Sequence, residues 1–357
     1  MNGSLRRAQA FAQRMGLRLP LLMAPMAGVP ALPLATAVAQ AGAMAAMGAL
    51  LKHPPAITDW VLRYRATTQG PLQINLWVPD PAPPRDAEHE ARLRDFLGRF
   101  GPAVSAEAGD ASLPNFDAQC QALLALQPAA VSSIMGLYPP GFVAQLKAAG
   151  IAWFATVTSV AEARAAEAAG ADVIVAQGAE AGGHRGAFDA AVAREQAVGL
   201  LALLPQVVDA VRVPVVATGG IGDARGVAAA LVLGASAVQI GTALLRCPEA
   251  GIHPVWAAGL DGLAPEGTRL TRAFSGRWGR AIASDYVRAA AAPDAPEPAP
   301  YPVQRGLTAA MRQAAEAQGE LQCMQAWAGQ GAGLARAVPA AELVQALWIG
   351  AQERLGA

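Results

Sequence analysis

The stretch that decides the fold is Val213-Pro-Val-Val-Ala-Thr-Gly-Gly-Ile-Gly-Asp-Ala-Arg225, with its continuation Gly234-Ala-Ser-Ala-Val-Gln-Ile-Gly-Thr242. Each part begins with a short apolar run that is typical of a strand buried on both faces. Residues 223–233 between them have helical spacing, with Asp223 as the expected N-cap and Gly234 as the expected stop. A buried strand, a glycine turn and a helix form the repeating unit of a parallel α/β sheet.

The same unit recurs along the chain. Residues 159–169 form another helical segment, in which Ser159 and Glu162 have the spacing of a capping box. Strand and helix alternating eight times predict a (β/α)8 TIM barrel. The alternative is a doubly wound open sheet, which would want an early glycine-rich dinucleotide turn, and Ala24-Pro-Met-Ala-Gly28 is not one. The eight apolar runs are Leu21–Met26, Ala43–Leu50, Leu72–Val78, Ala129–Met135, Ile151–Val157, Ala171–Gln177, Val213–Gly219 and Ala237–Leu245.

Two stretches interrupt this alternation. Pro79–Pro84 opens a polar connection to about Asn115, which we interpret as a long loop. Residues 246–306 contain five prolines after position 292 and little periodicity, so we expect a small insertion or lid there. The expected organisation is a barrel over 1–245, the lid over 246–306, and C-terminal helices over 307–357 that pack back on the barrel.

Composition narrows the class of protein and its partners. The 357 residues are 54% apolar and 15% charged, which excludes disorder for most of the chain. Lys plus Arg and Asp plus Glu each number 27, so the chain lacks the basic field that nucleic acid requires. Prolines interrupt the apolar stretch from Leu19 to Leu51, so no membrane helix is expected there.

Cysteine usage favours a cytoplasmic protein. Cys120, Cys247 and Cys323 are odd in number and lack metal-like spacing, so neither a disulfide framework nor a zinc site is expected. Arg6 and Arg7 precede apolar residues as in a secretion signal, but no continuous apolar region follows them.

Glycines at the ends of two predicted strands indicate a phosphate site. Gly219 and Gly220 end one strand, and Gln239, Ile240, Gly241 and Thr242 end the next. In a barrel these would be strands seven and eight, whose loops frequently hold a phosphate on backbone amides. The alternative is that the glycines form only a tight turn.

A single histidine stands out beside a third strand end. Gln177 ends a buried strand, and a loop with Gly182, Gly183 and Gly186 encloses His184. An imidazole with a pKa near 6.5 suits general acid–base work at neutral pH. A lone histidine is usually structural, but glycines on both sides of this one, at a barrel strand end, favour a catalytic role.

Two further strand ends offer groups that suit a flat ring. Asn75 breaks an apolar strand, either to tie down a loop or to face a polar ring. Ala24, Pro25 and Met26 end the first strand, where Met26 could lie against a ring or pack in the core. Paired carboxylates, a metal-ligand cluster and a Walker loop are absent from the sequence. A phosphorylated flat cofactor with one histidine points to flavin mononucleotide, FMN.

At these residues the sequence resembles the nitronate monooxygenase family. The resemblance rests on Ala24-Pro-Met-Ala-Gly28, Gln73-Ile-Asn75, Gln177-Gly-Ala-Glu-Ala-Gly-Gly-His-Arg-Gly186, Ala217-Thr-Gly-Gly-Ile221, Gln239-Ile-Gly-Thr242, Ser275-Gly-Arg277, Tyr301-Pro-Val-Gln304 and Gly329-Gln-Gly331. It implies a TIM barrel with a smaller second domain and bound FMN. It also implies flavin contacts from Met26 and its neighbours, Asn75, Gln177, Gly182, Gly219 and residues 239–242.

The resemblance implies a reaction as well. Alkyl nitronates such as propionate 3-nitronate would be oxidised by O2 to a carbonyl compound and nitrite, with His184 as the base for neutral nitroalkanes. For a nitronate, a protonated His184 would bind the anion instead. Tyr301 and Arg305 occupy a stretch that reaches the substrate in some members. FMN-dependent NAD(P)H reductases of quinones or enoyl thioesters share much of the pattern and remain the alternative. A homodimer is possible.

Overall fold

Eight parallel strands form a closed barrel in the computed structural model, which describes residues 3–356. The strand order is β1-β9-β8-β6-β5-β4-β3-β2, and a parallel bridge between Leu22 and Met44 joins the first strand to the start of the last. Each strand lies inside one of the eight predicted runs, so the (β/α)8 barrel is confirmed. The strands are β1 (Leu21–Met23), β2 (Ala45–Gly48), β3 (Leu72–Trp77), β4 (Ala130–Ile134), β5 (Ala152–Val157), β6 (Val173–Gln177), β8 (Val215–Thr218) and β9 (Ala237–Ile240).

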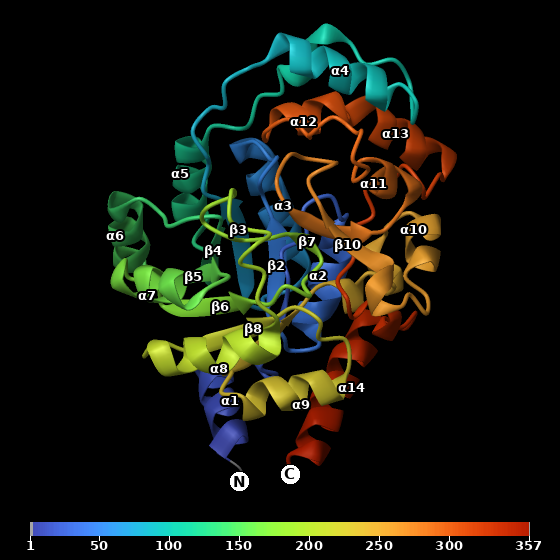
Figure 1. The fold of residues 1–357 in the computed structure, drawn as a ribbon. Coiled ribbons are helices and arrows are strands. Elements are labelled where there is room, and N and C mark those ends of the chain that lie inside the picture. The colour runs from blue at the N-terminus through green and yellow to red at the C-terminus, as the bar shows by residue number, and fades with distance from the viewer. Residues whose placement is uncertain (1–2, 357) are drawn as a thin grey trace.

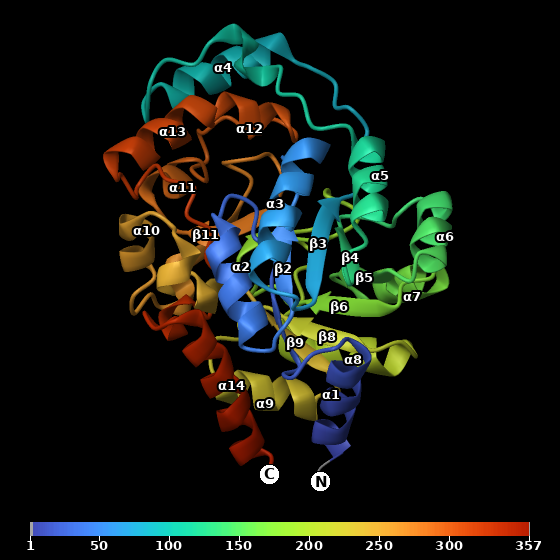
Figure 2. The same cartoon turned by 180° about the vertical axis from the view of Figure 1, so that it is seen from behind.

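Helices surround this barrel (Figures 1 and 2). Two of the expected N-caps are confirmed, since Ser159 accepts from Glu162 N–H and Asp223 accepts from Gly226 N–H. The surrounding helices are α2 (Ala31–Gln40), α3 (Pro54–Thr67), α5 (Phe116–Leu126), α6 (Pro140–Ala148), α7 (Val160–Ala168), α8 (Leu200–Ala210), α9 (Ala224–Val232) and α14 (Ala340–Arg354).

The amino-terminal end of the barrel is plugged by α1 (Gly3–Arg14) and the turn after it. Phe11, Met15 and Leu17 are buried in one apolar cluster with Phe154 and other residues from the strands. This end is therefore filled with side chains, and the carboxyl ends of the strands are left for a binding site, as in other barrels of this kind.

A second layer covers the carboxyl end of the barrel, at the top of Figure 1. Its antiparallel sheet has the order β10-β11-β7. Its strands and helices are β7 (Gly183–His184), β10 (Thr268–Thr271), β11 (Gly279–Ile282), α4 (Ala87–Leu97), α10 (Pro254–Gly259), α11 (Asp285–Ala289), α12 (Val303–Leu307) and α13 (Ala309–Gln318). Single 3-10 turns are η1 (Ala106–Gly109), η2 (Thr242–Leu244), η3 (Pro248–Ala250), η4 (Pro265–Gly267) and η5 (Ala332–Leu334).

The interpretation of residues 79–115 as a long loop was wrong for α4. Leu93, Phe96 and Leu97 have the i, i+3, i+4 spacing of one helical face, and they pack in the same cluster as Phe274 and Met311. Asp86 caps the helix by accepting from His89 N–H. The prolines before α4 made this segment resemble a loop in the sequence. The apolar face of the helix is buried against lid residues that lie far away along the chain.

The boundaries 1–245, 246–306 and 307–357 stay a prediction, and the apolar clusters group the chain differently. Met311 on α13 belongs to the lid cluster together with α4. Leu343 and Leu347 on α14 belong to the barrel cluster instead. The lid thus combines α4, which lies between two barrel strands in the sequence, with segments that follow the last barrel strand.

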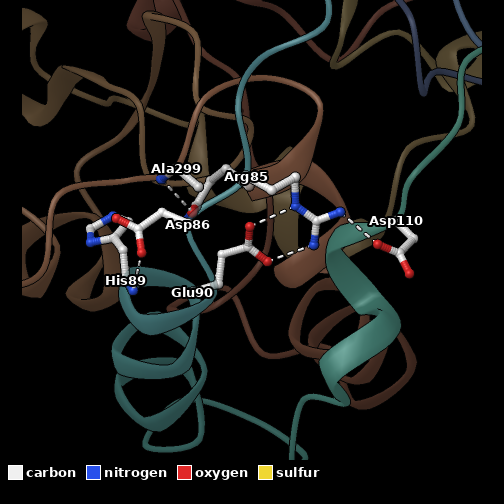
Figure 3. Close-up of polar contacts among 7 residues, drawn as sticks. Arg85, Asp86, His89, Glu90, Asp110 and Ala299 are labelled. Atoms are coloured by element: carbon white, nitrogen blue, oxygen red, sulfur yellow. Dashed lines mark hydrogen bonds and ion pairs between the residues drawn. The ribbon is translucent and has the colours of Figure 1, made fainter.

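An ion-pair cluster fastens the start of the α4 segment (Figure 3). Arg85 donates to Glu90 at 2.6 Å through two nitrogens and to Asp110 at 2.5 Å. Glu90 is almost fully buried, and the Arg85 guanidinium holds the pKa of that carboxyl below its usual range. Within residues 3–356, no helix is both long enough and apolar enough to cross a membrane.

Candidate active site

A cavity of about 270 Å³ lies between the barrel mouth and the lid. With one exception, every site residue expected from the sequence lines it: Ala24, Pro25, Met26, Asn75, Gln177, Gly182, His184, Gly219, Gly220, Gln239, Gly241, Thr242, Tyr301 and Arg305. The exception is Ile240, whose side chain is buried in the cluster between the barrel and its helices. The fold therefore brings residues from seven separate sequence segments to one cavity.

Backbone groups dominate one end of the cavity, at the ends of β8 and β9. Gly219 and Gly220 have φ angles of +114° and +70°, a region that glycine adopts without strain. The N–H groups of Gly220 and Gly241 make no hydrogen bond within residues 3–356. Donors of this kind at glycine positions can approach phosphate oxygens closely.

A strap from the carboxyl-terminal part of the chain closes the same end. Thr242 Oγ1 accepts from Gly329 N–H at 3.0 Å, so its own hydrogen is left to donate. A Cβ at Gly182 would lie 2.5 Å from the Gly329 nitrogen and 2.8 Å from Thr242 Oγ1. Two backbone segments thus pass so closely that only glycine fits at position 182.

The floor of the cavity carries amides whose orientation is fixed by the barrel interior. Asn75 Nδ2 donates to the Ser132 carbonyl and to Ser132 Oγ, both at 3.1 Å, which leaves Oδ1 without a donor among residues 3–356. Gln73 Nε2 donates to Gln239 Oε1 at 3.1 Å, and Gln239 Nε2 makes no hydrogen bond to any residue from 3 to 356. One free acceptor and one free donor in the floor match the mixed edge of a flat heterocycle.

His184 stands at the other end, on β7. Its Nε2 lies 2.7 Å from Ser275 Oγ, and its ring packs between Trp77 at 4.6 Å and Trp327 at 4.7 Å between ring centroids. Burial first, and then the positive charges of Arg277 and Arg305, lower the pKa of His184 to about 3. The ring is therefore neutral at pH 7.

Gln177 holds the His184 loop. Its Nε2 donates to the His184 carbonyl at 3.1 Å, and its Oε1 accepts from Gly186 N–H at 2.8 Å. Arg185 adds a hydrogen bond from Nη1 to the Gln177 carbonyl at 2.5 Å. Although Gln177 lines the cavity, both ends of its amide already serve the backbone that carries His184.

Two arginines from the lid line the cavity. The Arg305 side chain makes no ion pair or hydrogen bond within residues 3–356, which leaves its charge available. Arg312 donates to the Arg305 carbonyl at 2.9 Å and to Gln325 Oε1 at 3.2 Å, and burial, together with the charge of Arg305, lowers its pKa to about 10. The Tyr301 hydroxyl oxygen is buried and has no hydrogen-bond partner within residues 3–356. Two cations without a carboxylate partner favour an anionic ligand.

Four residues of this end were not predicted. Trp77 lies two positions after Asn75 on the same strand, so strand alternation alone could have indicated it. Ser275, Trp327 and Arg312 reach the cavity from the lid; Ser275 stands in a segment that carries the family resemblance, but no pattern gave any of the three a place in the site. From β4, Ser132 and Ile134 line the wall.

Comparisons with known proteins agree over nearly the whole chain. The family model described as nitronate monooxygenase matches residues 12–350. A nitronate monooxygenase of Paraburkholderia phytofirmans is 40% identical and is aligned over 95% of this chain and 94% of its own length. One from Pseudomonas aeruginosa is 38% identical, with 94% and 97% covered. The chain belongs to the nitronate monooxygenase family.

Solved structures superpose on both the barrel and the lid of this chain. A nitroalkane oxidase from Streptomyces ansochromogenes superposes with a TM-score of 0.87 and 36% identity, covering 96% of this chain and 98% of its own. FabK from Thermotoga maritima superposes at 0.75 with 24% identity, covering 97% and 96%, which shows a shared fold only. As a member of the nitronate monooxygenase family, the protein is an oxidoreductase with a TIM-barrel fold.

Proposed function

We propose that the protein oxidises alkyl nitronates with O2, using FMN, and forms a carbonyl compound and nitrite. The observation that carries this proposal is a neutral, half-buried His184 facing the same cavity as the unpaired Arg305. A neutral imidazole can accept a proton from the carbon next to a nitro group. A free guanidinium beside it suits the anion that results, or a substrate that is already an anion.

The residues of the cavity fit FMN. The Gly220 and Gly241 N–H groups and the Thr242 hydroxyl would hold its phosphate, and Asn75 Oδ1 and Gln239 Nε2 would meet the donor and acceptor edge of its ring. Met26 and the backbone of Ala24 and Pro25 would lie against the same group. When bound, FMN supplies the electron-accepting chemistry and the reaction with O2.

One tautomer of His184 suits a role as the base. Ser275 Oγ lies 3.3 Å from the Arg277 carbonyl, to which it donates. In the tautomer that we propose, it accepts from His184 Nε2–H at 2.7 Å, which leaves Nδ1 as the nitrogen with a lone pair. Nδ1 would therefore take the α-proton of a neutral nitroalkane.

The expectation that a protonated His184 binds a nitronate does not suit this environment. With a pKa of about 3 the ring carries no charge at pH 7. The positive charge for an anionic substrate comes instead from Arg305, with Arg312 behind it. In a substrate such as propionate 3-nitronate, Arg305 and the unpartnered Tyr301 hydroxyl would meet the polar groups remote from the reacting carbon.

Oxygen consumption by the FMN-loaded protein on addition of propionate 3-nitronate tests this function. Rapid O2 uptake with nitrite release is the expected result. If a protein that retains its flavin takes up no O2, the proposed monooxygenase reaction is contradicted. Rapid anaerobic bleaching of the flavin by NADH would then identify the NAD(P)H reductase alternative.

A further inference from the structure

An ion pair joins the barrel to the lid beside His184 without touching the cavity. Arg277 donates to Asp80 from Nε at 2.8 Å and from Nη2 at 2.6 Å, a bidentate pair. Arg277 is 4% exposed and Asp80 37% exposed, measured on their side chains. Neither residue is among those that line the active-site cavity.

Both ends of this pair are adjacent to the groups that contact His184. Asp80 lies three residues after Trp77, whose ring packs edge-on against the imidazole. Arg277 lies two residues after Ser275, and its backbone N–H and carbonyl both contact Ser275 Oγ. The pair thus connects two of the chain segments that contact the imidazole, those of Trp77 and Ser275.

The pair also governs the electrostatics around the ring. The charged groups whose fields act on His184 are Arg277 and Arg305, both positive. Asp80 is the carboxylate that faces Arg277, and it offsets the positive charge of that side chain. Without Asp80, the positive charge of Arg277, which acts on His184, would no longer be offset by its carboxylate partner.

We propose that Asp80 is a positioning residue, whose ion pair with Arg277 keeps Ser275 and Trp77 on His184 and limits the positive charge around the imidazole. This inference rests on His184 acting as the base in the proposed function. Two consequences separate it from simple structural support. Proton abstraction from a neutral substrate should suffer when Asp80 loses its charge, whereas binding of an anion should improve.

The test compares Asp80→Asn with Asp80→Glu and with Asp110→Asn. Asp110 is a matched control, because it also pairs with an arginine of the same segment, Arg85 (Figure 3), and within residues 3–356 no hydrogen bond or ion pair joins it to a residue that contacts His184. Each FMN-loaded variant is assayed with neutral nitroethane and with preformed ethyl nitronate. For Asp80→Asn we expect kcat/KM on nitroethane to fall about tenfold and KM for ethyl nitronate to fall about threefold, since a charge of this kind contributes on the order of one pKa unit.

The other variants sharpen the outcome. Asp80→Glu should stay within about threefold of the unmodified protein on both substrates, because it keeps the charge. Asp110→Asn should leave both rates unchanged. Equal losses on the neutral and the anionic substrate in Asp80→Asn would overturn the electrostatic role and leave only structural support. If Asp80→Asn does not fold, Arg277→Lys keeps the charge without the bidentate geometry, and unchanged nitroethane kinetics in that variant would overturn the positioning role.

A second readout does not depend on turnover. Nitrate binding is followed by the tryptophan fluorescence of the protein, to which Trp77 and Trp327 beside the imidazole contribute. Asp80→Asn should bind nitrate several-fold more tightly than Asp110→Asn, and equal affinities would contradict the proposal. Because this measurement needs no substrate oxidation, failure of the proposed function and failure of this inference remain distinguishable.

Discussion

The two ends of the active-site cavity are built in opposite ways. The end at β8 and β9 consists of backbone N–H groups at glycines that lie close together in the sequence. The end at His184 consists of side chains brought from far apart, with 91 positions between His184 and Ser275 and 197 between Arg277 and Asp80. The first arrangement depends mainly on local backbone, closed by the strap at Gly329, whereas the second depends on side chains positioned by docking of the lid.

This difference separates cofactor binding from chemistry. A cradle of backbone amides has few degrees of freedom and tolerates no added Cβ where two segments touch. A base held by distant side chains can be altered by changes far from it in the sequence. Substitutions at the two ends should therefore fail in different ways.

The largest effect is expected at His184. His184→Asn removes the base from the lid end and leaves the glycine cradle intact. We expect kcat/KM on a neutral nitroalkane to fall by about 10²–10⁴, the usual contribution of a general base. Flavin content, measured by absorbance after purification, should not change. Activity close to that of the unmodified protein would remove His184 from the mechanism.

The next largest effect is expected at the cradle. In Gly182→Ala, the new Cβ would lie 2.5 Å from the Gly329 nitrogen, so one backbone must move. Overpacking of this kind costs about 1–3 kcal/mol, and we expect flavin affinity to fall about 10–100-fold. The measurement is the dissociation constant for FMN added to the apoprotein.

Gly141→Ala is the matched control for this change, because a Cβ there meets no atom within 4 Å. Its flavin affinity should equal that of the unmodified protein. If Gly182→Ala bound FMN as tightly as the unmodified protein, the contact between residues 182 and 329 would not shape the cofactor site.

The difference between the two ends of the cavity also determined which parts of the molecule could be predicted from the sequence. The barrel and the residues at its strand ends followed from local patterns, because strand, glycine turn and helix cap lie within a few positions of one another. Asn75 and Thr242 were found in this way, since each ends or interrupts an apolar run. Ile240 was included only as part of such a run, and its side chain points into the core behind the strand.

The lid end could not be predicted in this way. Ser275 and Trp327 reach His184 through a small antiparallel sheet that pairs β7 with β11. A two-residue strand such as β7 has no periodicity of its own. Helix α4 was missed for a related reason, because its apolar face is complementary to residues nearly two hundred positions away. Long-range complementarity is a property of the folded chain.

A smaller effect concerns the pH dependence of stability. His184 has a pKa of about 3 when folded and about 6.5 when unfolded. Between these values the unfolded chain binds a proton that the folded chain does not, so stability falls as the pH falls. Above pH 6.5 both states are neutral and the effect is absent.

The expected loss from this group is about 1.4 kcal/mol per pH unit below 6.5, or about 2 kcal/mol at pH 5. Urea unfolding midpoints at pH 7.5 and pH 5, compared between the unmodified protein and His184→Asn, isolate this contribution. The histidine protein should lose more stability than the variant over this interval. An equal loss in both would mean that His184 is not held neutral by its surroundings.

The smallest effect is expected from Ser275→Ala, and it tests whether the lid end acts through geometry. The substitution removes a 2.7 Å hydrogen bond to His184 Nε2 and changes no charge. A neutral hydrogen bond contributes about 1 kcal/mol, so kcat on nitroethane should fall about three- to tenfold. Because Arg305 is untouched, KM for ethyl nitronate should remain the same. A loss of flavin in this variant would contradict the separation of the two ends, since the hydroxyl would then support the cofactor cradle as well as the base.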